Sequence, residues 1–163
     1  MDLSKLPNIN ILKNSSKPSH GFKYNHAFDG HGLLNVYKIN NGKFSYKGIR
    51  VQTHQYKMEH ALNTQIFRGF NTNIPYNPLF INDYCNISVL VHNNEVQACS
   101  EGGMPYVIDV KQGKTVGPKH LCPLMPYTPL SAHPIVKDDN VYNMSCYIAG
   151  LTLFDSNGII FNE

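Results

Sequence analysis

The sequence contains eight histidines, and one of them, His133, stands directly before a proline, Pro134. A residue before proline is pushed towards extended backbone, so the imidazole of His133 points in a fixed direction. Glu101 stands at the end of a predicted strand beside two glycines, where the backbone allows close approach. An imidazole held in this way suits a metal ion, and a nearby carboxylate can orient the ring of a metal ligand. His133 and Glu101 are therefore the candidates for metal chemistry.

The other histidines lack the spacing of a metal site. His26 and His31 flank a Phe-Asp-Gly segment, and His54 and His60 bracket a predicted helix. Residues six positions apart do not share a helix face, and none of these intervals matches a zinc-binding pattern. Each of these histidines, taken alone, can be a surface residue or a hydrogen-bonded residue without a metal. The residues alone leave this interpretation and metal binding both open.

Composition places the chain among globular domains. It has 163 residues, 42% of them hydrophobic and 15% charged, and a net charge of +3, which is too thinly spread for nucleic-acid binding. No run approaches about 18 apolar residues, so no transmembrane segment is predicted, and the start lacks the apolar core of a signal peptide. We therefore expect a cytoplasmic protein. Its four widely spaced cysteines favour reduced, buried thiols: Cys85, Cys99, Cys122 and Cys146.

The elements that would position these residues are mostly strands. Residues 1–25 are polar and rich in breakers, which predicts an irregular N-terminal arm. Alternating runs over 33–39 and 43–51, joined by Asn-Asn-Gly, predict a β-hairpin, because Asn and Gly tolerate the positive φ of tight turns. Residues 87–99 repeat this pattern around His-Asn-Asn, and residues 55–62 predict a short helix.

The rest of the chain continues in short strands and loops. Strands are predicted over 106–110, 141–148, 151–154 and 158–161, and loops over 71–83 and 121–134. The last two long strands form a further hairpin around Ala149 and Gly150. Several short strands at near-regular spacing favour a β-sandwich, a barrel or a propeller.

Four sequence blocks carry a resemblance to a known family. They are FDGHGLL at 28–34 with NGKFSY at 41–46, NTNI at 71–74, EGGMPYVID at 101–109, and SAHP at 131–134 with YN behind it. In this order and at this spacing, the chain from about residue 26 to residue 150 resembles the carotenoid cleavage oxygenases. That family includes apocarotenoid oxygenases and lignostilbene dioxygenases.

The resemblance implies a fold and a set of site residues. The fold is all-β, a partial seven-bladed β-propeller of about two or three blades with long loops. The propeller would occupy residues 26–163, after the arm at 1–25. Family members hold Fe(II) with four histidines, and glutamates hydrogen-bond to three of those rings. His133 stands at the position of the first iron ligand and Glu101 at that of one such glutamate, whereas His31 stands at no ligand position.

The resemblance also implies an activity and a limit to it. Members activate O2 at the iron and cleave a conjugated double bond of a carotenoid, apocarotenoid or stilbene. The blocks that bring the other three histidines lie beyond residue 163 in the family pattern, which implies a truncated N-terminal portion. Because one imidazole does not hold Fe(II) against water, we expect this chain alone to be inactive.

Two alternatives stay open at this stage. The chain is one half of a split dioxygenase, whose second chain completes the propeller and supplies the missing histidines, or it is a non-enzymatic β-rich binding module. An open set of blades leaves apolar faces without a neighbour, so we also expect self-association.

Overall fold

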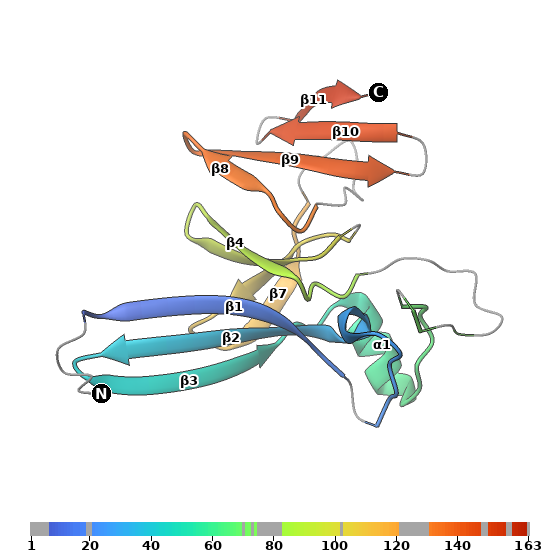
Figure 1. Cartoon of the computed structure of the whole chain (residues 1–163), viewed down its shortest axis with the longest axis horizontal. Helices are drawn as coiled ribbons and strands as arrows, with labels where there is room; N and C mark the ends of the chain where they lie inside the picture. The colour runs from blue at the N-terminus through green and yellow to red at the C-terminus, as the bar shows by residue number, and fades with distance from the viewer. Residues whose placement is uncertain are drawn as a thin grey trace.

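The computed structural model of the chain describes residues 7–18, 21–69, 71–72, 74, 83–101, 103–120, 131–147, 150–155 and 158–162. Three antiparallel sheets follow one another along the chain and lie one above another in Figure 1. Two of the sheets have four strands and one has three. Strands that pair with their neighbours in sequence form such sheets in propeller blades. The expected all-β, partial-propeller fold is therefore confirmed.

The first sheet contains the predicted N-terminal hairpin. Its three strands, in spatial order, are β1 (Ile9–Lys17), β2 (His31–Asn40) and β3 (Lys43–Arg50). Asn41 and Gly42 form the turn with φ angles of 49° and 73°, in the left-handed region that these two residue types tolerate. The hairpin prediction is confirmed, with its boundaries shifted by one or two residues.

The N-terminal segment differs from the irregular arm expected over residues 1–25. Residues 9–17 form β1, which pairs with β2 along its whole length. The amide of Asn14 donates to the backbone oxygens of Cys85 (2.7 Å) and Ser88 (3.0 Å), so a residue typical of loops fixes this strand against the next sheet. Backbone pairing outweighs the weak strand propensity of this polar segment.

The second sheet is a four-stranded meander. Its strands are β4 (Ser88–His92), β5 (Glu95–Cys99), β6 (Tyr106–Asp109) and β7 (Lys114–Pro118). Asn93 and Asn94 turn the predicted hairpin with φ angles of 47° and 60°. The last strand has no counterpart in the sequence prediction, because Gly117 and Pro118 read as loop residues.

The third sheet is a second four-stranded meander. Its strands are β8 (Ile135–Lys137), β9 (Asn140–Tyr147), β10 (Gly150–Asp155) and β11 (Gly158–Asn162). The predicted hairpin of β9 and β10 is confirmed, as is the strand near residue 160. The predicted loop over 121–134 lies outside the described residues between 121 and 130, and the loop over 71–83 lies largely outside them.

The helix α1 (His54–Leu62) confirms the expected helix and has clear caps. The Thr53 side chain accepts the backbone N–H of Tyr56 at 3.1 Å, and Asn63 ends the helix in the left-handed conformation. Figure 1 shows α1 at one end of the first sheet. The helix carries Glu59, whose side chain is buried.

The core lies between the first two sheets. Leu34 and Val36 of β2 belong to the same buried cluster as Ala98, Tyr106 and Ile108 of the second sheet. A second, smaller cluster joins the next pair of sheets through Leu90, Cys99 and the partly buried Val141. These contacts set the spacing of the loops between the sheets, where the candidate site lies.

Two further expectations concern thiols and membrane segments. Cys85 and Cys99 are free and buried, as expected for reduced thiols, and burial raises the pKa of the Cys99 thiol to about 12. The side chains of Cys122 and Cys146 lie outside the described residues. Within the described part of the chain, no helix has the length and apolar character to cross a membrane.

Candidate metal and substrate pocket

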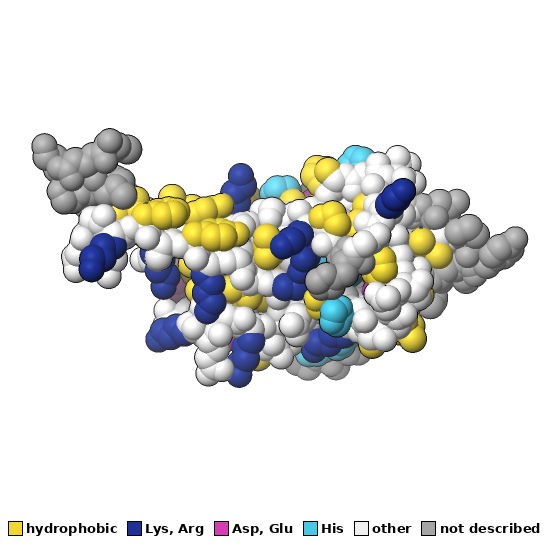
Figure 2. All heavy atoms as spheres, turned by 90° about the horizontal axis from the view of Figure 1, so that it is seen from below, with side chains coloured by type: hydrophobic (Ala, Val, Ile, Leu, Met, Phe, Trp, Pro, Cys, Tyr) yellow, Lys and Arg dark blue, Asp and Glu magenta, His cyan; other side chains and the backbone are white. Residues whose placement is uncertain are grey.

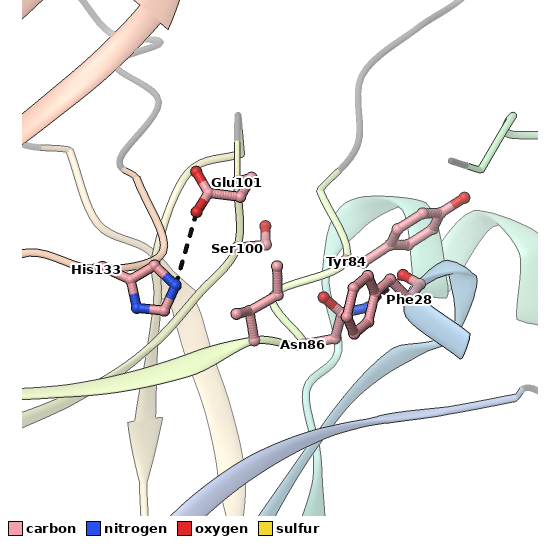
Figure 3. A pocket seen from close by; sticks show the side chains of 7 residues that line it. Phe28, Tyr84, Asn86, Ser100, Glu101 and His133 are labelled. Atoms are coloured by element: carbon pink, nitrogen blue, oxygen red, sulfur yellow. Dashed lines mark hydrogen bonds and ion pairs between the residues drawn. The ribbon is translucent and has the colours of Figure 1, made fainter. Parts of the chain in front are cut away.

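The structure brings His133 and Glu101 together. The Nε2 atom of His133 lies 3.9 Å from Oε1 of Glu101, and the two side chains point toward each other in Figure 3. The side chain of His133 is 76% exposed and that of Glu101 is 59% exposed. A longer contact between two accessible groups leaves room for either one to bind a further partner. Their role towards a metal remains a prediction.

Hydrogen bonds fix the backbone around His133. The Ser88 hydroxyl of β4 donates to the backbone oxygen of Ala132, and Ala132 is fully buried. The backbone N–H of His133 donates to Oγ of Ser131 at 3.1 Å. An anchored residue followed by Pro134 therefore presents an accessible imidazole.

A cavity of about 370 Å³ opens beside the pair, and both aromatic and polar side chains line it. Its walls come from four segments that are distant in sequence: Phe28, Tyr84, Asn86, Ile87, Ser100, Glu101 and His133. Figure 3 shows Phe28 and Tyr84 on the side away from His133, with Asn86 and Ser100 between. The cavity is thus aromatic at one end and carries the imidazole and the carboxylate at the other.

Asn86 fixes the aromatic end of the pocket. Its side-chain amide donates to the backbone oxygens of Phe28 and Gly30, each at 2.6 Å. The adjacent Ile87 donates its N–H to Cys99 at the end of β5. Two adjacent residues therefore connect the Phe-Asp-Gly turn to the strand pair that leads to Glu101.

Tyr84 also lines the aromatic end of the pocket, and its phenol is neutral. Its hydroxyl donates to the backbone oxygen of Arg68 at 3.2 Å, and its own backbone oxygen accepts the N–H of Gly32 at 2.8 Å. Burial raises the pKa of the Tyr84 phenol, and the carboxylates of Glu59 and Asp29 raise it further. The ring is a neutral wall of the pocket.

The aspartate of the first sequence block has a structural role. Asp29 is fully buried, and its Oδ2 accepts the hydroxyl of Thr72 at 2.5 Å and the N–H of Asn71 at 3.2 Å. The first and second sequence blocks therefore contact each other directly. Gly30 ends this turn, and β2 follows it directly at His31.

Sequence reasoning missed a second pair of histidine and glutamate. Nε2 of His31 lies 2.8 Å from Oε2 of Glu59, and both side chains are buried. The other carboxylate oxygen accepts the N–H groups of Ile66 and Phe67, each at 3.0 Å. Glu59 lies 28 positions from His31, and no local sequence pattern links the two residues.

The described residues do not by themselves fit a complete iron site. They contain no group of three or more His, Cys, Asp or Glu that could hold a metal ion. The pocket receives one imidazole and one carboxylate, whereas protein metal sites generally assemble three or more ligands.

Comparison with known proteins places this geometry in a family. Residues 10–158 match the retinal pigment epithelial membrane protein family. The chain belongs to this family, the carotenoid cleavage oxygenases. The motif order that suggested the family is thereby confirmed.

Two curated relatives are oxygenases by name. The chain is 27% identical over 115 residues to the probable chloroplastic carotenoid cleavage dioxygenase 4 of Arabidopsis thaliana, covering 56% of this chain and 19% of that protein. It is 24% identical over 96 residues to resveratrol cleavage oxygenase 1 of Botryotinia fuckeliana, covering 57% of this chain and 17% of that one. The chain therefore spans less than a fifth of these family members.

Solved structures establish the fold over nearly the whole chain. The lignostilbene dioxygenase of Pseudomonas brassicacearum matches with a TM-score of 0.79 at 20% identity, over 96% of this chain and 36% of that one. A variant of the Synechocystis apocarotenoid oxygenase matches with a TM-score of 0.78 at 20% identity, over 96% of this chain and 38% of that one.

Proposed function

We propose that this chain forms part of the pocket of an oxygenase that cleaves a conjugated double bond. His133 would be one ligand of Fe(II), and Glu101 would orient the imidazole through its other ring nitrogen. The observation that carries the proposal is the convergence of these two residues on one cavity from segments 32 positions apart in sequence. Bound iron would supply O2 activation, and the residues described here would hold and orient the reactants.

The pocket suits an extended apolar substrate better than a charged one. Phe28 and Tyr84 present aromatic surface, and burial raises the pKa of Tyr84, so its phenol stays neutral to higher pH than an ordinary tyrosine. Ordered apolar walls of this kind bind a flat conjugated chain through area burial and ring contacts. A carotenoid, an apocarotenoid or a stilbene is the proposed substrate class.

We propose further that the chain alone does not catalyse the reaction. Two other histidines point to different tasks: His31 is buried against Glu59, and His92 contacts the backbone oxygen of Asp139 at 2.7 Å. With one imidazole among the described residues that line the pocket, the affinity for Fe(II) would be too low to keep the ion in place.

Iron content and turnover test these two statements together. The purified chain is loaded with Fe(II) under argon, desalted and assayed for iron and for O2-dependent cleavage of an apocarotenal. We expect substoichiometric iron and no carbonyl product. Stoichiometric iron with cleavage would show that the chain is a complete enzyme.

A family member that contains the matching blocks and the remaining histidines provides the positive control. Replacing its counterpart of His133 by alanine should remove iron and activity. Retention of both would reject the ligand role of this position. The His60→Ala variant of the present chain controls for non-specific loss of an imidazole, because His60 is an exposed residue outside the pocket lining.

A specific observation favours association with another sheet as a second candidate function. The face of the first sheet turned away from the core exposes Ile11, Phe44 and Tyr46 by 52%, 57% and 52%. Such a face suits either a second chain that completes a split dioxygenase or the partner of a β-rich binding module. Sedimentation at rising concentration tests it: a strictly monomeric chain would reject self-association. A cytoplasmic location is part of the proposal and is tested by cell fractionation.

A further inference from the structure

The charges of this chain are divided unevenly along its length. Residues 1–58 contain nine Lys or Arg and two acids, a net charge of +7, whereas residues 59–163 contain five Lys or Arg and nine acids, a net charge of −4. The first sheet lies within the positive part. At the left end of Figure 2, hydrophobic side chains lie along one side of the molecule and Lys or Arg side chains along the other.

A groove of about 300 Å³ lies on the basic side. It opens between the strands of the β2–β3 hairpin and the turn that joins β6 to β7. Six of its lining residues are Lys38, Lys47, Lys111, Ser45, Val36 and Val110. Three lysines, a serine and Tyr46 therefore line this space together with two valines, and the groove shares no lining residue with the pocket of His133.

A hydrogen bond joins the two sides of the groove. The ammonium group of Lys47 donates to the backbone oxygen of Lys111 at 3.3 Å and so bridges the hairpin and the turn. Gly113 of the turn has a φ of +76°, and a Cβ on it would lie 2.4 Å from Nζ of Lys47. The turn conformation therefore favours glycine at this position, and the end of the Lys47 side chain lies directly against it.

The described residues provide no acid to neutralise these lysines inside the groove. The lining contains no Asp or Glu among the residues described. Asp109 lies close by in sequence, but its Oδ1 accepts the backbone N–H of Gln112 at 2.8 Å within the turn. Several like charges around one concave space repel each other unless an anion lies between them.

We propose that this groove binds a small phosphate-bearing anion. Lysine ammonium groups are compact point charges that bind phosphate oxygens, and the Ser45 hydroxyl adds a neutral donor. Val36 and Val110 would contact the carbon part of the ligand. A soluble phosphomonoester and a lipid headgroup share this chemistry, and the test separates them.

The test is a titration of the ¹⁵N-labelled full chain with inorganic pyrophosphate, followed by amide chemical shifts. Saturable shifts are expected at Lys38, Ser45, Lys47 and Lys111. The variants Lys38→Gln and Lys47→Gln should each weaken binding about fivefold, the loss of one exposed charge near an anion. Lys13→Gln is the matched control, because Lys13 is an exposed lysine of the same sheet outside the groove lining.

Parallel flotation with phosphatidylcholine vesicles containing phosphatidic acid distinguishes the ligand source. Binding of pyrophosphate without flotation supports a soluble ligand, and flotation that Lys47→Gln reduces supports a headgroup. The proposal is overturned by an absence of saturable shifts at about 10 mM pyrophosphate together with no flotation. It is equally overturned if Lys13→Gln weakens binding as much as the groove variants, since the effect would then be net charge alone.

Discussion

The described part of the chain contains two contacts between a histidine and a glutamate, in opposite environments. His31 and Glu59 are 0% and 1% exposed and lie 2.8 Å apart, whereas His133 and Glu101 are 76% and 59% exposed and lie 3.9 Å apart. The rings of Tyr56 and Tyr84 lie edge-on to His31, each with its centroid 5.2 Å away. The first pair is enclosed by protein on every described side, and the second faces a cavity.

The difference separates two uses of the same residue types. A buried polar group must be satisfied by its neighbours, so the carboxylate of Glu59 gathers an imidazole and two backbone N–H groups. An exposed pair gains little from its own contact and can exchange it for a ligand. The first pair therefore contributes to stability, whereas binding by the second pair is the proposal made above. The following substitutions test the contrast in stability.

The largest effect is expected at Glu59. Glu59→Ala leaves the N–H groups of Ile66 and Phe67 and the buried ring of His31 without their acceptor, and should lower the free energy of unfolding by about 3–5 kcal/mol. Urea unfolding measures it. Glu101→Ala is the control and should change stability by less than about 0.5 kcal/mol. Equal losses in the two variants would contradict the contrast between the pairs.

Gly32, beside His31, should be nearly as sensitive. A Cβ at Gly32 would lie 2.1 Å from the backbone oxygen of Cys85, which cannot move without shifting the strand, so Gly32→Ala should cost about 3 kcal/mol. Thermal unfolding measures the loss. Gly117→Ala is the matched control, because a Cβ there meets nothing within 4 Å. A stable Gly32→Ala protein would show that the buried region is less rigid than its packing indicates.

The buried residue Asp83 should make the free energy of unfolding depend on pH. Burial raises its pKa from 3.8 to about 6, against the opposing hydrogen bond from Tyr106 and the charge of His54. The folded state therefore favours the protonated acid. This contribution to stability is complete below about pH 4 and is lost as pH rises through about 6, by up to about 3 kcal/mol.

The Asp83→Asn variant isolates this effect. The difference in unfolding free energy between Asp83→Asn and the parent chain should grow in favour of the variant between about pH 4 and pH 7. Asp109→Asn is the control and should show no such growth, because Asp109 caps an exposed turn. A difference that stays constant with pH would place Asp83 in contact with solvent.

The smallest effect is expected for an ion pair of intermediate exposure. Lys119 and Glu95 are 35% and 38% exposed and lie 2.6 Å apart. Lys119→Ala should cost about 0.5–1 kcal/mol in urea unfolding, and high salt should reduce this cost. A loss as large as that of Glu59→Ala would break the correlation between burial and stability on which the comparison rests.

Much of the fold could be predicted because its turns carry local signals. The pairs Asn41–Gly42 and Asn93–Asn94 adopt positive φ angles, which few other residue types tolerate. Short segments of the sequence are therefore enough to predict the hairpins. The strand β1 carries no such signal. Its Asn14 makes hydrogen bonds to residues 71 and 74 positions away, which no local pattern records.

The residues of the two histidine–glutamate pairs also differ in whether the sequence alone could identify them. His133 and Glu101 could be found because each stands in a sequence block of the family, and Pro134 restricts the backbone beside one of them. The pairs of His31 with Glu59 and of Asp83 with Tyr106 could not be found. They join segments through packing of the first two sheets and the helix, and their residue types alone have many other uses.

The most direct test of the contrast between the two pairs is a Mn²⁺ titration of the full chain, followed by the imidazole resonances of its histidines. Paramagnetic broadening of the His133 resonances should come first and should diminish in Glu101→Gln, while the His31 resonances stay sharp. Broadening of His31 before His133, or no preference among the histidines, would contradict the assignment of the open pair to metal binding and the buried pair to stability.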